Sequence, residues 1–291
     1  MWFIFALLSA LFAGLHTFIV KVGAERKYDT YLLGTFSSLI TAVAATVLFL
    51  IVSPDDYIPL PLYGYALITG VLFAGFTIAR MEALTMIDAA IFFPLYKVIG
   101  PALVAGIGIF ILHETVSTPE LIGIVLSCFV PLLLISRHEN TRQKNLQLGL
   151  ILMVVGTTLA SISAAVNAVA VNENLGFALP LVALANAIAA IVHFGLFLWK
   201  HRANGIRKQV QLLSTPPFLS ISLANGIVQL FSFYFLLLAI AGDSLSIVYS
   251  INAHYILIPV LLSVWIYKEH WNLQKAAALV LSMLALILLH R

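Results

Sequence analysis

Ten apolar stretches divide this chain, and its positive charges fall almost entirely into every second connection between them. The stretches cover approximately residues 2–22, 31–52, 61–84, 89–112, 119–136, 146–171, 178–199, 216–241, 244–267 and 272–289. Each is about long enough to cross a hydrocarbon core of about 30 Å as a helix that rises about 1.5 Å per residue. The sequence therefore predicts an all-α integral membrane protein with ten transmembrane helices.

The composition indicates that lipid is the solvent for most of the chain. With 62% hydrophobic and 9% charged residues, the chain has too few polar side chains to cover a surface in water. No connection is long enough for an extramembrane domain, and the longest, from His201 to Pro217, is predicted to be a basic loop. Any function is therefore expected inside the helix bundle.

The distribution of positive charge predicts the orientation. Thirteen of the 15 Lys and Arg residues lie in or beside the odd-numbered connections, and the exceptions are Lys97 and Arg291. Cytoplasmic loops carry the excess of Lys and Arg, so these connections are predicted to be cytoplasmic and both termini to lie outside. The net charge of +3 follows from topology and does not argue for a nucleic-acid partner. We expect a multi-pass protein of the cytoplasmic (inner) membrane.

The two halves of the chain share a weak internal repeat. A shift of 155 residues superimposes their apolar stretches and aligns several polar positions. These pairs are Asp88 with Asp243, Glu114 with Glu269, and Ser127 with Ser282. Because each half has five spans, an odd number, the second half enters the membrane from the opposite side. The sequence thus predicts two inverted five-helix repeats, residues 1–145 and 146–291.

Several short motifs of the first half are typical of one transporter family. They are Phe12-Ala13-Gly14 in a first span that closes at Lys21, Ala83-Leu84 ending the third span, a proline inside the fourth, Glu114 closing it, and Gly123 opening the fifth. In these motifs the chain resembles the EamA-like branch of the drug/metabolite transporter superfamily. The resemblance implies a ten-helix exporter or exchanger of small metabolites, with a central cavity lined mainly by spans 1, 3, 4, 6, 8 and 9.

Two features of the chain depart from that resemblance. Members usually carry an arginine in the second span and basic residues after it. This second span offers only the hydroxyls of Ser37, Ser38 and Thr41, and Asp55 and Asp56 follow it. The cytoplasmic termini usual in the family therefore disagree with the charge distribution of this chain.

Lys97 is the most informative residue inside a span. It lies about 12 Å along the fourth helix at about 1.5 Å per residue, too deep to reach the interface easily. An unpaired lysine facing lipid there would cost about 3 kcal/mol or more. Pro94 and Pro101 share a helical face with it and are predicted to kink the helix, as is tolerated beside a polar cavity. The alternative is that the prolines bend a packed helix and an internal carboxylate neutralises Lys97.

Other polar groups are expected at a similar depth, where they would bind a solute. The repeat aligns Asn252 with Lys97, and its segment continues to a predicted kink at Pro259. The candidate substrate-binding residues are Lys97, Asn252, Gln229, Tyr96, His16, His254 and Tyr255. The alternative for each is a hydrogen bond between packed helices.

The acidic residues are expected to be structural. Asp88 and Asp243 precede spans as N-cap residues would, and Glu114 and Glu269 close spans at the interface. None of the 12 carboxylates lies in the middle of a predicted span, which disfavours a multidrug cation/proton antiporter. Any proton coupling would have to use His16, His254 or Lys97.

Taken together, these features predict a secondary transporter rather than an enzyme. His113-Glu114 lacks the second histidine of a zinc-binding HExxH, no glycine-rich phosphate loop occurs, and neither a cofactor nor a metal is expected. The expected substrate is a small polar metabolite, an amino acid or a related carboxylate, moved by alternating access. The alternatives are a lipid-carrier flippase and an uncoupled facilitative path.

Small residues at equivalent positions of the fifth and tenth spans raise the possibility of a homodimer. Gly123 and Ser127 in one span, and Ala278 and Ser282 in the other, are each spaced by four, so each pair shares one helical face. The alternative is that both faces pack inside the bundle.

The charge distribution makes a prediction about topology. A reporter that is active only outside the cytoplasm is expected to work when fused after His290, and a cytoplasmic reporter is expected to work near Asn204. Activity of alkaline phosphatase and of green fluorescent protein at the two sites measures this. The reverse pattern at both sites would show that the cytoplasmic termini usual in the family hold for this chain.

Overall fold

A computed structural model describes residues 1–26, 28–53, 57–87, 89–134, 145–173, 178–213, 215–258, 261–262 and 273–290. Over these residues every regular element is a helix and none is a strand. The prediction of an all-α chain is therefore confirmed. The predictions made for Asp88, Pro259 and Glu269 lie outside the described residues.

The helices follow the apolar stretches of the sequence. They are α1 (Trp2–Glu25), α2 (Thr30–Val52), α3 (Leu60–Met86), α4 (Ala89–Phe110), α5 (Thr118–Leu133), α6 (Leu146–Glu173), α7 (Ala178–Leu213), α8 (Pro216–Ile240), α9 (Leu245–Ala253), the 3-10 turn η2 (His254–Ile256) and α11 (Leu273–Leu289). Each of the ten predicted stretches contains one of these α-helices, although α9 is short and gives way to the 3-10 turn.

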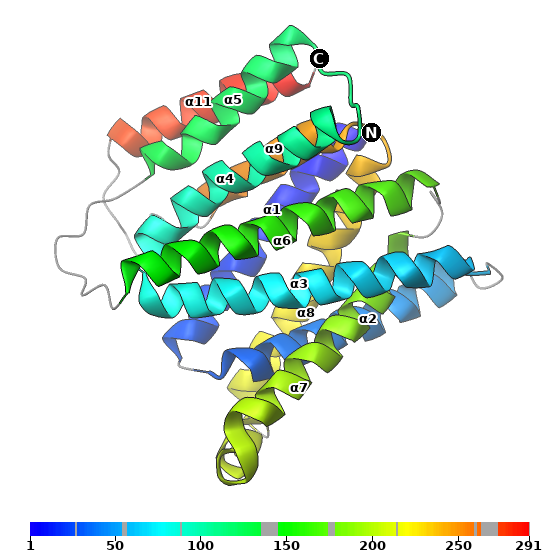
Figure 1. The fold of residues 1–291 in the computed structure, drawn as a ribbon, viewed down its shortest axis with the longest axis vertical. Coiled ribbons are helices and arrows are strands. Elements are labelled where there is room, and N and C mark those ends of the chain that lie inside the picture. Colours follow the sequence, from blue (N-terminus) through cyan, green and yellow to red (C-terminus); the bar gives the residue numbers. More distant parts are fainter. Residues whose placement is uncertain are drawn as a thin grey trace.

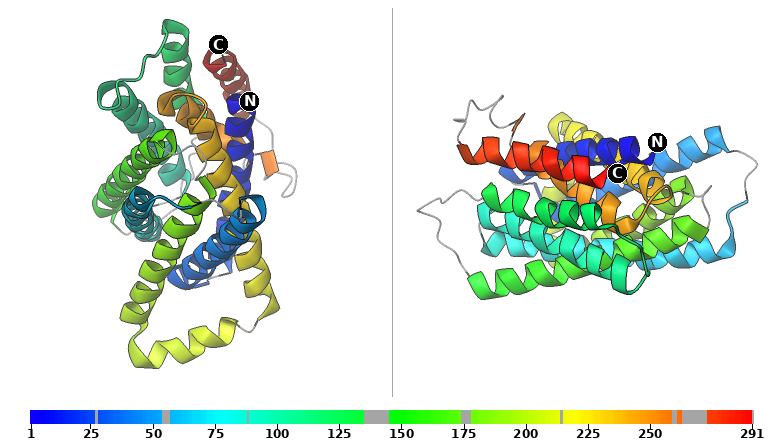
Figure 2. Two further views of the ribbon diagram at one scale, coloured as in Figure 1. Left: turned by 90° about the vertical axis from the view of Figure 1, so that its right-hand side faces the viewer. Right: turned by 90° about the horizontal axis from the view of Figure 1, so that it is seen from above.

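One predicted loop is helical. The prediction of a basic loop from His201 to Pro217 is wrong, because α7 continues to Leu213. Lys, Arg and Gln are good helix formers, so the basic segment extends the helix beyond its apolar part, which ends at His201. Figure 2 shows this last part of α7 turning across the end of the bundle.

Six helices are long and apolar enough to cross a membrane. They are Trp2–Val20, Thr30–Val52, Leu60–Leu84, Leu146–Glu173, Ala178–His201 and Pro216–Ile240. Shorter apolar helices cover Pro94–Phe110, Thr118–Leu133 and Leu273–Leu289. Large apolar side chains on the outside, such as Ile51 and Ile191, each 71% exposed, would face water in a soluble protein. These features indicate a multi-pass helical membrane protein.

The helices of the two halves of the chain interleave. Helix α1 packs on α8, α3 on α6, α2 on α7, α4 on α9 and α5 on α11. In Figure 1 the α5 and α11 pair lies at one end of the long axis and the α2 and α7 pair at the other. The rings of Phe3 and His290 stack with centroids 4.1 Å apart, so the two ends of the chain meet at the same end of the bundle. An even number of membrane crossings would likewise put both termini on one side of the membrane.

Small residues bring α5 and α11 close together. A Cβ added at Gly123 would lie 2.8 Å from Cγ of Leu289 and 3.2 Å from the carbonyl of Ala285. Ser127, Ala278 and Ser282 are also buried. The small faces of both helices therefore pack inside the chain, as the alternative in the sequence analysis supposed. The homodimer itself stays a prediction.

The N-terminus of α9 is held by an acid from the other half of the chain. Glu114 accepts hydrogen bonds through Oε1 from the Leu245 amide at 2.6 Å, and through Oε2 from the Ser246 amide at 3.0 Å and the Ser246 hydroxyl at 2.5 Å. His113, whose φ of 56° lies in the left-handed region, turns the chain just before it. A carboxylate here satisfies free amides and opposes the positive end of the helix dipole.

This arrangement corrects the prediction that Asp243 caps the ninth span. The N-cap position belongs to Ser244, and Asp243 only accepts a hydrogen bond from the Ser244 amide at 2.6 Å. Partial burial raises the pKa of Asp243, and the nearby Glu120 and Glu114 add to that effect. Glu114 therefore takes the capping role because the packing of α4 on α9 brings its carboxylate to the exposed amides of α9.

We expect Glu114→Ala to lower the free energy of unfolding by about 2–3 kcal/mol, because three charge-assisted hydrogen bonds are lost. Glu114→Gln, which retains one acceptor oxygen, is expected to lose about half as much. Thermal unfolding of the purified protein in mild detergent measures both effects. Glu173→Ala is the control, since that carboxylate makes only an exposed hydrogen bond to Tyr65 among the described residues. Equal melting temperatures for Glu114→Ala and the wild type would contradict the capping role.

Candidate functional site

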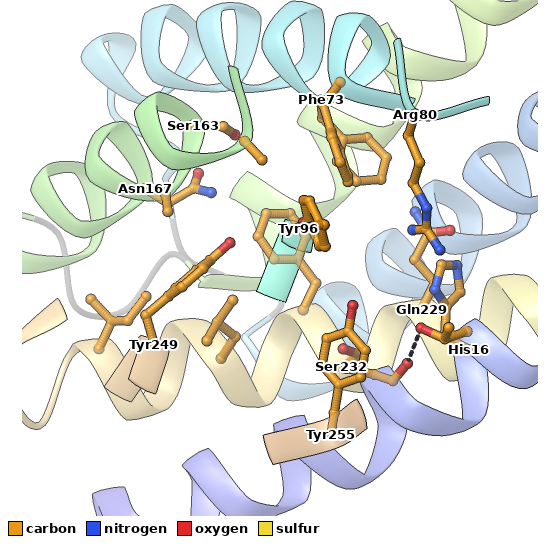
Figure 3. Close-up of a pocket in the computed structure, with 18 residues that line it drawn as sticks. His16, Phe73, Arg80, Tyr96, Ser163, Asn167, Gln229, Ser232, Tyr249 and Tyr255 are labelled. Atoms are coloured by element: carbon orange, nitrogen blue, oxygen red, sulfur yellow. Dashed lines mark hydrogen bonds between the residues drawn. The ribbon is translucent and has the colours of Figure 1, made fainter. Parts of the chain in front are cut away.

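A cavity of about 160 Å³ lies within the bundle, lined by apolar and aromatic side chains together with several polar ones (Figure 3). We call it the central cavity. Its walls come from α1, α3, α4, α6, α8, α9 and η2, which belong to the spans that the family resemblance implies. Because both halves of the chain contribute, a solute in this cavity would touch both at once.

Four of the seven predicted binding residues line the central cavity. They are His16 on α1, Tyr96 on α4, Gln229 on α8 and Tyr255 in η2. The Tyr96 ring stacks on Phe76 with centroids 5.7 Å apart, so part of the wall is a rigid aromatic surface.

The other three predicted residues, Lys97, Asn252 and His254, are buried but do not line this cavity. Asn252 donates to the Ser9 hydroxyl at 2.8 Å, and Ser9 donates to the Ser232 carbonyl at 2.9 Å. Nδ1 of His254 lies 2.9 Å from the Ser250 carbonyl, so this nitrogen carries the proton of the neutral ring. For Asn252 the structure has the hydrogen bond between packed helices that was the alternative to solute binding. The His254 hydrogen bond lies within its own helical segment.

Lys97 is packed against aromatic rings. It is 5% exposed, and its Nζ lies 3.6 Å from the centroid of Tyr255 and 5.1 Å from that of Tyr96. Lys97 forms no ion pair with a carboxylate of the described residues. Cation–π contact lowers the cost of a buried ammonium by about 2 kcal/mol when both groups are desolvated. Lys97 thus lies directly behind two tyrosines that line the cavity.

Two prolines interrupt the hydrogen bonding of α4 around Lys97. Pro94 and Pro101 both lie inside the helix and are buried. Neither has an amide proton, so the carbonyls of Ala90 and Lys97 lack their usual helical partners. The third predicted kink, at Pro259, falls outside the described residues, but the helix before it already changes to a 3-10 turn at His254.

Hydrogen bonds lead from Gln229 away from the cavity. Nε2 of Gln229 donates to Oδ1 of Asn186 at 2.7 Å, and Nδ2 of Asn186 donates to the Val182 carbonyl at 2.9 Å. These bonds fix the orientation of the Gln229 amide. His16, a titratable group, lies near Gln229 in the cavity wall.

Arg80 is the residue that sequence reasoning missed. Its place near the end of the third span led to its assignment as a topological loop charge. The structure places it in the wall of the central cavity, and Figure 3 shows its side chain extending from α3 toward His16 and Gln229. Its depth was the available signal, since it lies six residues before Met86, where α3 ends.

The opposite wall offers hydrogen-bonding groups without charge. In Figure 3, Asn167 and Tyr249 lie on the other side of the cavity from Arg80 and His16. Thr69 donates to Oδ1 of Asn167 at 2.9 Å, which orients the amide and leaves its NH₂ group for another acceptor. The cavity is therefore asymmetric, with a cation at one side and neutral polar groups at the other.

Comparison with known proteins establishes the fold alone. No family profile and no curated protein sequence matches the chain. Solved structures do match it, and one of them, described only as "Crystal structure of protein", has a TM-score of 0.77. That structure is 13% identical in sequence, and the alignment covers 97% of this chain and 95% of the other. At that identity the likeness concerns the arrangement of helices and not the solute.

Lys97→Gln is expected to abolish the transport that the sequence predicts while leaving a folded protein in the membrane. The reason is that the ammonium group makes cation–π contacts with the rings of Tyr255 and Tyr96 and adds positive potential behind the cavity wall. Uptake of radiolabelled amino acids into proteoliposomes measures the effect. Lys97→Arg, which retains the charge, is the matched control and is expected to keep part of the activity. Wild-type uptake by a folded Lys97→Gln protein would show that the charge serves packing only.

Proposed function

We propose that this chain is a secondary transporter of a small polar metabolite, an amino acid or a related carboxylate. The observation that carries the proposal is the asymmetric central cavity, buried between helices of both halves and bounded by Arg80, His16 and Gln229 on one side. Burying these groups in a membrane protein is costly unless they serve a partner or a solute. In this proposal the bundle would expose the cavity to each side of the membrane in turn.

The proposal includes two inverted repeats, residues 1–145 and 146–291. Suppose that α1 to α5 correspond in order to α6, α7, α8, α9 and α11. If each helix is then replaced by its counterpart in the other half, the contact between α1 and α8 becomes the contact between α6 and α3. Under the same replacement, each of the contacts α2–α7, α4–α9 and α5–α11 is unchanged. All of these contacts are present. A pattern of contacts that survives this exchange supports a pseudo-two-fold axis, on which the cavity would lie.

Membership of the EamA-like branch of the drug/metabolite transporter superfamily is part of the same proposal. It rests on the motifs of the first half and on the correspondence between the implied cavity-lining spans and the walls of the central cavity. The protein would work in the cytoplasmic membrane, without a cofactor.

The substrate would bind with its negative group toward Arg80 and a hydrogen-bonding group toward Asn167 and Tyr249. An arginine is suited to the first role because its planar guanidinium donates in a fork that matches a carboxylate. Three aromatic rings, those of Phe73, Phe76 and Tyr96, line the space between and would pack against the rest of the solute. Lys97 would act through Tyr255 and Tyr96 rather than touch the solute.

We expect uptake screening in proteoliposomes, with and without a pH gradient, to identify transported carboxylates, and Arg80→Gln to lower their uptake at least tenfold. The loss follows from removing the cation opposite the solute's negative group, which is worth about 2 kcal/mol at a separation of several ångströms in an effective dielectric of about 20. Lys200→Gln is the control, because it removes a half-exposed cation paired with Glu82 at 3.7 Å.

The same screen separates the alternatives. Uptake that ignores the pH gradient supports an uncoupled path, whereas stimulation by the gradient supports coupling through His16. Transport of a lipid-linked headgroup, with none of the free carboxylates transported, would replace the proposal with a flippase. Normal carboxylate uptake by Arg80→Gln would refute the assignment of Arg80.

A further inference from the structure

A second cavity, of about 300 Å³, lies beside the central one. Its walls come from α1, α2, α3, α7 and α8, and it reaches Tyr28 and Thr30 where the first connection leads into α2. By the charge distribution this is the cytoplasmic side of the bundle. The central cavity instead extends toward Ile240, at the far end of α8. The two cavities therefore lie one after the other along the proposed transport path, the second cavity on the cytoplasmic side and the central cavity beyond it.

The two cavities share five residues, namely His16, Phe73, Phe76, Arg80 and Gln229. Phe73 and Phe76 have ring centroids 6.3 Å apart, and Phe76 also stacks on Tyr96. These aromatic rings narrow the passage, while Arg80 is accessible from both sides. A solute leaving one cavity for the other would thus keep contact with the same cation.

The far wall of the second cavity carries buried polar groups whose hydrogen-bonding capacity is not fully used within the described residues. Asn225, 3% exposed, donates through Nδ2 to the Ser37 hydroxyl at 2.8 Å, whereas its Oδ1 has no hydrogen-bond partner among the described residues. His193, 1% exposed, lies with its ring against Gly34, but that contact lacks hydrogen-bond geometry, so neither ring nitrogen is paired within the described chain. A buried polar group without a hydrogen-bond partner destabilises a protein, so these groups favour a bound ligand at this wall.

The chemistry of these walls is specific. Oδ1 of Asn225 accepts hydrogen bonds and cannot donate, and a neutral His193 has one accepting nitrogen. Both therefore suit a donor such as an ammonium or amide group. Arg80, at the shared boundary, suits a carboxylate. One wall recognises a hydrogen-bond donor and the other an anion, which together describe an amino-acid-like solute.

We propose that the second cavity is a separate binding compartment on the cytoplasmic side, in which a small amino carboxylate binds with its carboxylate at Arg80 and its amino group at Asn225 and His193. The identity of the solute rests on the proposed function, but the compartment does not. A solute would be selected here by both groups before it passes Phe73 and Phe76 into the central cavity.

The compartment is tested by labelling single cysteines in a Cys128→Ala background. Ser38→Cys reports the second cavity, Ser163→Cys the central cavity, and Tyr57→Cys an exposed position in the connection between α2 and α3. The probes are the anionic sulfonatoethyl and the cationic trimethylammonioethyl methanethiosulfonates. With each, the thiolate attacks the probe's sulfenyl sulfur, forms a mixed disulfide and releases methanesulfinate. We expect Arg80→Gln to lower the anionic-over-cationic rate ratio about tenfold at Ser38→Cys and to leave it unchanged at Tyr57→Cys.

The binding groups are tested by protection with three matched solutes. L-alanine has both groups, propionate lacks the amino group, and ethylamine lacks the carboxylate. We expect L-alanine to slow the labelling of Ser38→Cys more than either of the others. Asn225→Leu is expected to abolish that advantage at Ser38→Cys but to preserve protection at Ser163→Cys. His193→Gln gives the same comparison if Asn225→Leu does not fold.

The outcomes are distinct. Three results would each overturn the proposal. The first is a folded Ser38→Cys protein that reacts with neither probe, and the second is equal protection by all three solutes. The third is loss of protection at both cysteines in the Asn225→Leu variant. If labelling and protection follow the expected pattern while proteoliposomes take up no solute, the compartment stands and the proposed transport function fails.

Discussion

The structure depends on one constraint, which is that a polar group in hydrocarbon must find its partner within the protein. Water is absent from the bilayer core, so an unsatisfied backbone or side-chain group there costs several kcal/mol. Several of the described polar side chains accordingly bond across helices. Thr41 donates to the Gly226 carbonyl at 2.8 Å, and Thr69 donates to Asn167 at 2.9 Å. These pairings help to fix how α2 faces α8 and how α3 faces α6.

The same constraint explains two ionisable residues of the first half of the chain. Glu114 is an anion at the end of a helix, and it is stabilised by the amides of Leu245 and Ser246 rather than by solvent alone. Lys97 is a cation at membrane depth, and it is stabilised by the faces of Tyr255 and Tyr96. In both cases a residue of the first half is satisfied by a segment of the second, so the interface between the halves is held by polar contacts as well as by apolar packing.

Arg80 shows how far local sequence patterns lead. A charge near the end of an apolar stretch usually lies at the membrane interface. On that pattern, Arg80 was counted among the positive charges of the connections that predict the orientation. Its side chain instead lies between two cavities, because α3 packs between α6 and α7 and presents this face to α1 and α8. Conversely, Asn252 occupies the depth expected of a binding residue but faces Ser9 of α1. Depth along a helix is visible in the sequence, whereas direction around the helix is not.

The sequence by itself determined that the chain is all helical, that its apolar stretches are suited to a membrane, and that His16, Tyr96, Gln229 and Tyr255 lie at the depth of a cavity. These are local properties, because length, hydropathy and position along a span follow from neighbouring residues alone. The tertiary structure decided that Arg80 rather than Lys97 meets the cavity and that Glu114 rather than Asp243 caps α9. It also decided that the small faces of α5 and α11 meet each other. Those outcomes depend on which helices become neighbours, and that choice is made by packing between residues far apart in the chain.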